Sequence, residues 1–191
     1  MKIGKVLLIL GAGAACVVTG GLAAPAIGAV VGTTFMAYLA EILTDAGFHG
    51  VRTYIQSGNI LFDTDLSRAE TTLMIHDTIL EKIGADLSVI LKTREQLAVA
   101  AAENPFGEGY DVSRIHLTFT NDTVDAAKVK SIEETDFGCE KFIRGSECFY
   151  LYLPLGVRNR ALYSGYLEKR LGITTTTRKL SVVTRLCKLA E

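Results

Sequence analysis

Polar side chains that can hold a ligand gather first in the stretch YIQSGNILF. Tyr54, Gln56, Ser57 and Asn59 offer a phenol, two side-chain amides and a hydroxyl close together in the chain. Gly58 lies among them, and a residue without a Cβ allows a ligand to approach the backbone closely. The stretch therefore predicts a polar ligand-binding tip between two strands.

The same stretch is also typical of a tight turn. Gly58 followed by Asn59 is the dipeptide that a two-residue type II′ hairpin prefers, with the glycine first. The flanking runs, 51–56 and 60–62, predict the two strands of such a hairpin. We favour the turn, and a turn that also contributes to a site is the main alternative.

A second group of candidates lies on the run 113–120, which alternates between polar and apolar residues. In a strand, Arg114, His116 and Thr118 share one face and the apolar residues share the other. An imidazole can carry protons near neutral pH. A histidine without an identified acid or nucleophile beside it is more often a hydrogen-bonded structural residue, so the catalytic residues stay unassigned.

The third group of candidates lies in the run ITTTTR near the C-terminus. Threonine hydroxyls and the guanidinium of Arg178 can bind a phosphate, because both donate hydrogen bonds to its oxygens. Four threonines in a row are equally typical of an edge strand. The candidate ligand-binding residues are Tyr54, Gln56, Ser57, Asn59, Arg114, His116, Thr177 and Arg178.

The net charge of −1 conceals two segments of opposite sign. Residues 36–155 carry a net charge of −9, whereas residues 156–191 carry +6. A basic terminal segment can attract an anionic partner, either a small ligand or a nucleic acid. It can equally dock on the acidic body of its own chain, which we favour because this interpretation requires no partner.

Cysteine and histidine are too few and too scattered for a metal site. The four cysteines include no C-x-x-C pair, and three histidines cannot complete the usual zinc spacings. We therefore expect no metal and no cofactor, with free thiols in a reducing, cytoplasmic compartment.

The N-terminal region differs from the rest, because no charged residue occurs between Val6 and Ala40. Such a segment is long enough to span a bilayer, with Lys2 and Lys5 as its inner anchor. It also has the charged start, apolar run and small residues of a secretory signal. A third interpretation makes KVLLIL the first strand of the fold. Membrane association through this segment is thus the alternative to a cytoplasmic location.

The remaining chain predicts a mixture of helices and strands. The helix over 67–83 has the clearest signals, because Ser67 and Glu70 form a capping box before an apolar stripe. Further helices are predicted over 36–46, 94–104, 123–132, 159–171 and 180–190, and further strands over 87–91, 141–143 and 148–153. Helices mixed with antiparallel hairpins indicate an α+β fold. With KVLLIL as first strand, the first half has the strand-helix-strand-strand-helix-strand order of a ferredoxin-like fold.

Four stretches of the chain also form a recognisable series: MAYLAEILTDAGFHGVRTYIQSGNILFDT, ENPF, RIHLTFTN and LEKRLGITTTTR. On these stretches, residues 36–191 resemble a family of small, mostly bacterial proteins, domain-of-unknown-function family 1697 (DUF1697). The resemblance implies a ferredoxin-like first half with an antiparallel sheet and a related α+β second half. It implies no activity, because none is established for the family.

Two parts of the chain depart from the family's pattern. Members begin with a strand and a basic, glycine-containing turn, whereas the uncharged segment 1–35 stands in that place here. Near the C-terminus, residues 176–178 match the family, but Lys179 and Leu180 replace an asparagine and a tryptophan.

These features together predict three regions. They are an atypical uncharged segment over 1–35, a ferredoxin-like subdomain over 36–110, and a second α+β subdomain with basic C-terminal helices over 111–191. The leading hypothesis is a binding module for a small anionic ligand or a nucleic acid. An enzyme of unknown reaction and a membrane-tethered interaction domain are the alternatives.

Overall fold

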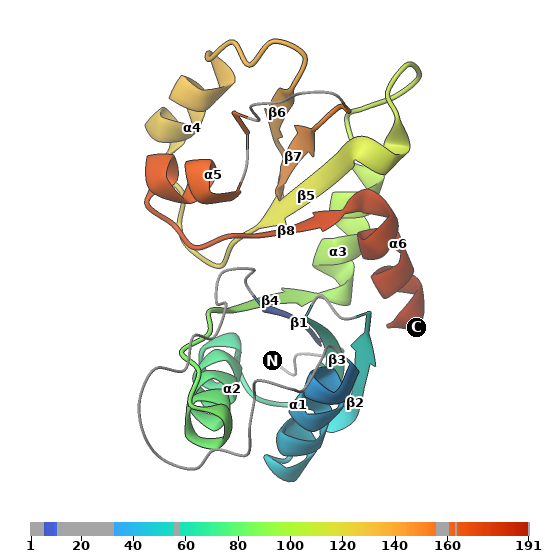
Figure 1. The fold of residues 1–191 in the computed structure, drawn as a ribbon, viewed down its shortest axis with the longest axis vertical. Helices are drawn as coiled ribbons and strands as arrows, with labels where there is room; N and C mark the ends of the chain where they lie inside the picture. Colours follow the sequence, from blue (N-terminus) through green and yellow to red (C-terminus); the bar gives the residue numbers. More distant parts are fainter. Residues whose placement is uncertain (1–5, 11–32, 56–57, 156–160, 163, 191) are drawn as a thin grey trace. The chain divides into compact units, whose positions relative to one another are not determined.

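The computed structural model describes residues 6–10, 33–55, 58–155, 161–162 and 164–190 of the chain. The chain divides into two compact units, and the division falls between Thr93 and Arg94. Each unit contains a four-stranded antiparallel sheet with helices packed against it (Figure 1). The predicted α+β fold with antiparallel sheets is confirmed.

Unit 1 has the element order β-α-β-β-α-β. Its strands are β1 (Val6–Leu10), β2 (His49–Tyr54), β3 (Asn59–Asp63) and β4 (Val89–Thr93), and its helices are α1 (Thr33–Asp45) and α2 (Arg68–Ile83). The strands lie in the order β2-β3-β1-β4, each antiparallel to its neighbour. This is the element order that the ferredoxin-like prediction requires.

Strand β1 bears on the three interpretations of the N-terminal region. The run VLLIL pairs with both β3 and β4, as the first-strand interpretation predicts. Positions 11–32, on which the membrane and signal interpretations depend, lie outside the described residues. Among the helices that the structure does describe, none is long and apolar enough to cross a membrane.

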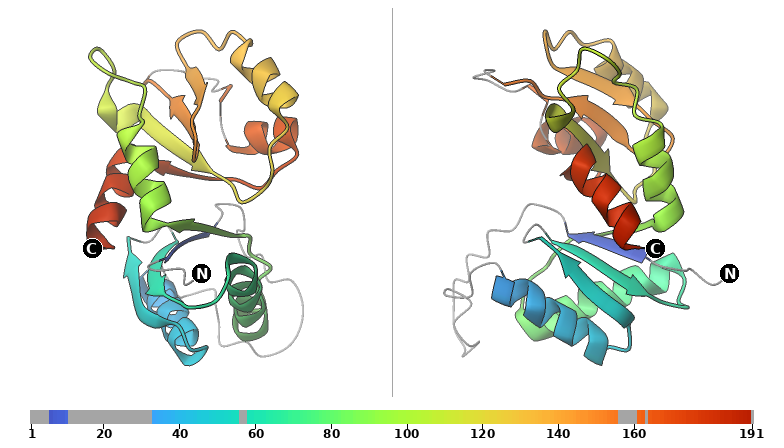
Figure 2. Two further views of the ribbon diagram at one scale, coloured as in Figure 1. Left: turned by 180° about the vertical axis from the view of Figure 1, so that it is seen from behind. Right: turned by 90° about the vertical axis from the view of Figure 1, so that its right-hand side faces the viewer.

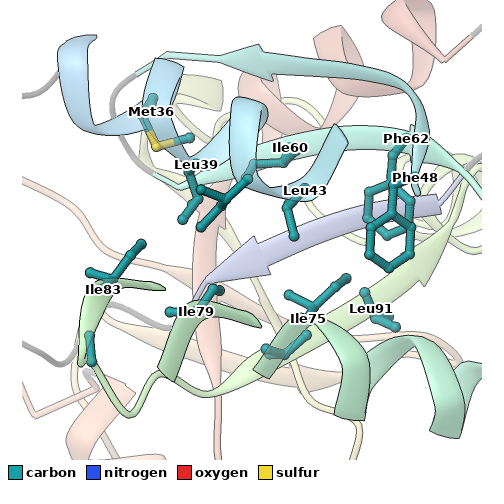
Figure 3. Close-up of a cluster of buried hydrophobic side chains, with 13 residues drawn as sticks. Met36, Leu39, Leu43, Phe48, Ile60, Phe62, Ile75, Ile79, Ile83 and Leu91 are labelled. Carbon is teal, nitrogen blue, oxygen red and sulfur yellow. The ribbon is translucent and has the colours of Figure 1, made fainter. Parts of the chain in front are cut away.

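The core of unit 1 lies between its sheet and the apolar stripes of α1 and α2. Figure 3 shows side chains from both helices pointing towards the strands, and the labelled residues include Leu39, Leu43, Ile75, Ile79, Ile60 and Leu91. Both helices therefore cover the same face of the sheet. The predicted capping box of α2 is present, because the Ser67 hydroxyl accepts from the Glu70 amide and the Glu70 carboxylate accepts from the Ser67 amide at 2.8 Å.

Unit 2 begins with α3 (Arg94–Ala102) and then repeats the order of unit 1. Its strands are β5 (Ile115–Phe119), β6 (Lys141–Arg144), β7 (Phe149–Tyr152) and β8 (Thr176–Lys179); its helices are α4 (Ala126–Glu133), α5 (Ser164–Leu171) and α6 (Leu180–Leu189), and a 3-10 turn, η2 (Val112–Arg114), precedes β5. The strand order β6-β7-β5-β8 is that of unit 1, with β5 in the place of β1 and β8 in the place of β4.

Strand β8 lies between the predicted helices 159–171 and 180–190, where the sequence analysis gave an edge strand as one of two interpretations of the threonine run. The end of the threonine run forms an edge strand that pairs with β5, and α6 starts directly after it. The β-branched threonines suit this extended edge position.

The sheet of unit 2 has helices on both faces (Figure 1, Figure 2). On one face, α4 and α5 cover Phe142, Phe149 and Leu151. On the other face, α3 packs beside α6, and the hydroxyl of the buried Tyr150 donates to the carbonyl of Ala100 in α3 at 2.8 Å. Helix α3, which the sequence analysis assigned to the first subdomain, thus belongs to unit 2.

Candidate functional site

The β2–β3 hairpin holds four of the predicted site residues. Tyr54 pairs directly with Asn59, so the connection spans positions 55–58. The predicted two-residue type II′ turn is therefore wrong, because Asn59 already belongs to β3. Among the described residues of the connection, Ile55 and Gly58 have positive backbone φ angles, of 51° and 77°. Gln56 and Ser57 lie outside the described residues.

The side chain of Asn59 helps to close this hairpin. It is fully buried, and its Nδ2 donates to the carbonyl oxygen of Tyr54 at 3.1 Å. Tyr54 itself is half-buried. The amide thus has a structural use, and a ligand role for this tip stays a prediction.

In unit 2, strand alternation distributes the other predicted residues over two faces of the sheet. His116 of β5 lies opposite Lys179 of β8, and Thr118 lies opposite Thr177. Residues directly opposite each other in an antiparallel pair point to the same face. We call these four residues the polar strip.

The polar strip lies on the face that α4 and α5 cover. On the other side of β5, His116 and Thr118 are opposite Leu151 and Phe149 of β7. Those two residues belong to the core under α4 and α5. The strip therefore continues an apolar core with hydroxyl, imidazole and ammonium groups.

The inner half of the strip is a pair of hydroxyls. Oγ1 of Thr118 lies 2.8 Å from Oγ1 of Thr177, and Thr118 has no exposed surface. Each hydroxyl can be donor or acceptor, so the pair satisfies part of its own hydrogen-bonding capacity inside the unit.

The outer half carries the groups that ionise. Lys179 is exposed, whereas His116 is half-buried with Nδ1 at 2.9 Å from the carbonyl oxygen of Arg114. A carbonyl only accepts hydrogen bonds, so Nδ1 carries the proton in this contact. Nε2 is then the nitrogen at which the ring gains or loses its second proton.

Arg114 ends the η2 turn directly before β5. Its Nε lies 3.8 Å from Oδ2 of Asp111. This nitrogen atom is buried and has no hydrogen-bond partner among the described atoms. Oδ1 of Asp111 accepts from the Ser113 amide at 2.9 Å. Hydrogen bonds from Ser113, first from its side chain and then from its amide, lower the pKa of Asp111, and the positive charges of Arg114 and Lys179 lower it further. Both cations therefore lie within electrostatic reach of one carboxylate, at the start of β5.

Arg178 lies on the opposite face of the sheet from His116. It is opposite Leu117 and is only 6% exposed. Its Nη1 donates to Oγ1 of Thr176 and to the carbonyl of Thr177, both at 2.9 Å. Burial lowers the pKa of Arg178 to about 10, so the group is still charged at neutral pH. The structure thus separates two residues that the sequence analysis had grouped in one site.

Two carboxylates fix the start of the segment that becomes β8. Asp122 accepts from the amide of Thr174 at 2.7 Å, and Glu168 of α5 accepts from the amide of Thr175 at 2.9 Å. Hydrogen bonds to a carboxylate are short and strong. They favour one register of β8, and a slip by one residue would exchange its two faces.

Of the predicted residues, the structure brings together Arg114, His116 and Thr177, and it adds Thr118 and Lys179. Alternation along 113–120 already put Thr118 on the face of His116. The sequence does not distinguish Lys179 from the other basic residues of the terminal segment. Only the β5–β8 register shows that it lies opposite His116. In the part of the chain that the structure describes, no group of three or more His, Cys, Asp or Glu residues could hold a metal ion.

Comparison with known proteins places the chain. A family model described as "Protein of unknown function (DUF1697)" matches residues 28–150. The chain belongs to this family. No curated protein matches the chain. A solved structure of the conserved bacterial protein SP0830 from Streptococcus pneumoniae is similar, with a TM-score of 0.69, 20% sequence identity and 98% of each chain covered. At this identity, the likeness shows that the DUF1697 protein shares the fold of SP0830.

Proposed function

We propose that this DUF1697 protein is a binding module for an anionic group, carried by a small ligand or a nucleic acid, and that the polar strip with Arg114 forms its site. One observation carries the proposal: within the polar strip, Thr177 stands where unit 1 has a core residue. Strands β4 and β8 each end directly before a helix, β4 with Thr93 and β8 with Lys179. Two residues earlier, unit 1 has the buried Leu91 and unit 2 has Thr177.

Polar groups inside a core cost free energy unless they are hydrogen-bonded, and even then they contribute less than apolar groups of the same size. A buried hydroxyl loses its hydrogen bonds to water, and an apolar side chain at the same place would contribute the free energy of burial instead. Places where a protein departs from its own packing pattern are often functional. Unit 1 supports this argument because it has the same strand order with an apolar side chain at the position of Thr177.

The charges at the outer end favour an anion. Arg114 and Lys179 contribute two positive charges and Asp111 one negative charge, so the group is net positive with His116 neutral. Protonation of His116 adds a further positive charge. Guanidinium, ammonium and hydroxyl donors are the groups with which proteins bind phosphate, sulfate and carboxylate.

The test is anion binding by the full chain. Sulfate and phosphate are titrated against the protein, and a specific site raises the melting temperature as each anion saturates it. Lys179→Met is expected to weaken binding at least about tenfold, because it removes one charge-assisted contact. Lys188→Met is the matched control, since it removes the same charge from an exposed position of α6. No shift with a broad panel of anions, or equal losses in the two variants, would overturn the proposal.

A further inference from the structure

We infer that β6, the outer strand of the unit 2 sheet, binds an extended acidic segment of a partner protein, which adds a fifth strand to this sheet. The interface lies on the edge of the sheet and does not use the polar strip. It therefore goes beyond the proposed function, and neither proposal depends on the other. The inference comes from the backbone direction, the exposure and the charge of β6.

Strand β6 has a neighbouring strand on one side only. The strands lie in the order β6-β7-β5-β8, so β7 pairs with the inner edge of β6. This pairing is regular over all four residues of β6, from Lys141 opposite Tyr152 to Arg144 opposite Phe149. The outer edge of β6 is therefore a regular strand edge.

Two hydrogen bonds show which backbone groups of β6 are directed outwards. The amide of Gly145 donates to the carbonyl of Cys148 at 2.8 Å, so both residues are directed towards each other across the hairpin. The amide of Leu153 donates at 3.1 Å to the carbonyl just before β5, away from β6. Successive residues of a strand alternate between its two edges, so both bonds direct Phe142 and Arg144 outwards. Their N–H and C=O groups have no hydrogen-bond partner in the described part of the chain, and they can pair with an added strand.

The corresponding edge of unit 1 is interrupted. Strand β2 is the outer strand there, and its register with β3 shifts between His49 and Arg52. Gly50 lies in this interval with a φ angle of 60°. A bulge bends and twists a strand, which is one way in which proteins prevent a sheet edge from pairing. The register of β6 has no such shift, so its edge keeps the form that an added strand requires.

The side chains of β6 favour an acidic partner. Lys141 and Arg144 are exposed, and Ile143 between them is 36% exposed. Nζ of Lys141 donates to the carbonyl of Gly138 at 3.0 Å, which leaves the ammonium group two further donors. Opposite charges across an antiparallel pair stabilise it, and like charges destabilise it. A second copy of β6 would place Lys141 opposite Arg144, whereas an acidic segment would pair with both cations.

Antiparallel pairing predicts the sequence pattern of the partner. Its first acidic residue lies opposite Arg144, an apolar residue lies opposite Ile143, and a second acidic residue lies opposite Lys141. The pattern is thus acidic, apolar, any residue, acidic. In strand addition, main-chain hydrogen bonds supply the affinity and alternate side chains supply the specificity.

The test titrates the hexapeptide TEVTET, acetylated and amidated at its ends, into the full chain by NMR. The backbone amide signals of Phe142 and Arg144 are expected to shift as the peptide saturates the edge. Methylation of the backbone nitrogen of the second threonine should weaken binding at least about tenfold, because this nitrogen donates to β6. Methylation at the valine is the control and should change the affinity little, because its N–H is directed away from β6.

Charge reversal tests the choice of partner. Lys141→Glu combined with Arg144→Glu should weaken binding of TEVTET at least about tenfold and strengthen binding of TKVTKT. Arg185→Glu combined with Lys188→Glu is the matched control, since it makes the same change at exposed positions of α6. No binding of TEVTET at millimolar concentration, equal effects of the two methylations, or equal losses in the two double variants would overturn the inference. A dimer of the native chain that the β6 double variant dissociates would also overturn it, by assigning the edge to a second copy.

Discussion

Units 1 and 2 have the same element order and the same strand order, yet they use the last strand differently. In unit 1, β4 contributes Leu91 to the core under α1 and α2, and Thr93 ends the strand on the same face. In unit 2, β8 contributes Thr177 and Lys179 to the corresponding face. This arrangement of strands therefore accepts either apolar or polar residues on this face of its last strand. Folding alone does not require the polar strip of unit 2, so the strip needs another explanation.

The other face of the last strand is alike in the two units. Lys92 and Arg178 both stand one residue before the strand's end, and each is only 6% exposed. A buried cation at this place is therefore a feature of both repeats. The polar strip is particular to unit 2, which is why we assign the site to the strip rather than to Arg178.

The strongest test of this contrast gives unit 1 the polar residue of unit 2. Leu91→Thr should lower the free energy of unfolding by about 4 kcal/mol, because it creates a cavity and buries a hydroxyl among apolar side chains. Urea denaturation measures the change. Leu80→Thr on the exposed surface of α2 is the control and should change stability little. A small loss of stability in Leu91→Thr would mean that unit 1 also accepts a polar residue on this face of its last strand.

The next contrast concerns the residue directly before the second strand of each unit. Phe48 before β2 packs edge to face on Phe62, whereas Glu140 before β6 is a buried carboxylate. Its Oε2 accepts from the amides of Ala161 and Leu162 at 3.0 and 2.8 Å.

Glu140→Ala is expected to cost about 3 kcal/mol of the free energy of unfolding, because two amides lose their acceptor in a buried setting. Glu140→Gln keeps an acceptor oxygen and should cost clearly less. Thermal and urea unfolding of both variants measure the difference. If the two variants were equally destabilised, the negative charge rather than the hydrogen bonds would be the important property.

A smaller effect is expected within the polar strip itself. Thr177→Val should lower stability by about 1 kcal/mol, because the buried hydroxyl of Thr118 loses its partner. The double variant Thr118→Val with Thr177→Val should recover most of this loss, since both polar groups are then replaced by apolar ones of similar shape. A double-mutant cycle measures the coupling, and purely additive losses would contradict the paired role of the hydroxyls.

The smallest effect lies on the surface of unit 1, where His76 contacts Asp77 and Asp86 at 3.1 and 3.0 Å. Hydrogen bonds to Asp77 first, and then to Asp86, raise the pKa of His76. The resulting stabilisation is fully present below the unfolded pKa and is lost as the pH rises through the folded one. From pH 6 to pH 8, this contribution should fall by a few tenths of a kcal/mol, because exposed ion pairs are weak. His76→Gln should remove this part of the pH profile, and an unchanged profile in the variant would exclude the mechanism.

Local signals in the sequence were sufficient for much of the fold. The capping box of α2, the alternation of β5 and the order of unit 1 all depend on residues near each other in the chain, and the structure has them. The predicted two-residue turn between β2 and β3 was wrong, because the Gly58-Asn59 dipeptide does not reveal that Asn59 pairs with Tyr54 across the hairpin.

The candidate site was less accessible to prediction, because it depends on register between distant strands. His116 and Arg178 look equally suitable as site residues in the sequence, and only the pairing of β5 with β8 shows that they point to opposite faces. The run TTRK has a threonine and a cation on each face, so its pattern does not reveal which face is which. The bonds from Asp122 and Glu168 that favour the observed register come from other elements.

The place of α3 has a practical consequence for anyone who divides this protein. In the order of the chain, α3 follows β4 as α6 follows β8, so a cut between the repeats would naturally fall after Ala102. The contacts of Ala100 with Tyr150, and of Gln96 with Glu147 at 2.7 Å, instead tie α3 to the second sheet. An expressed fragment of the second half should therefore begin at or before Arg94, and one that begins at residue 111 should expose apolar surface and aggregate.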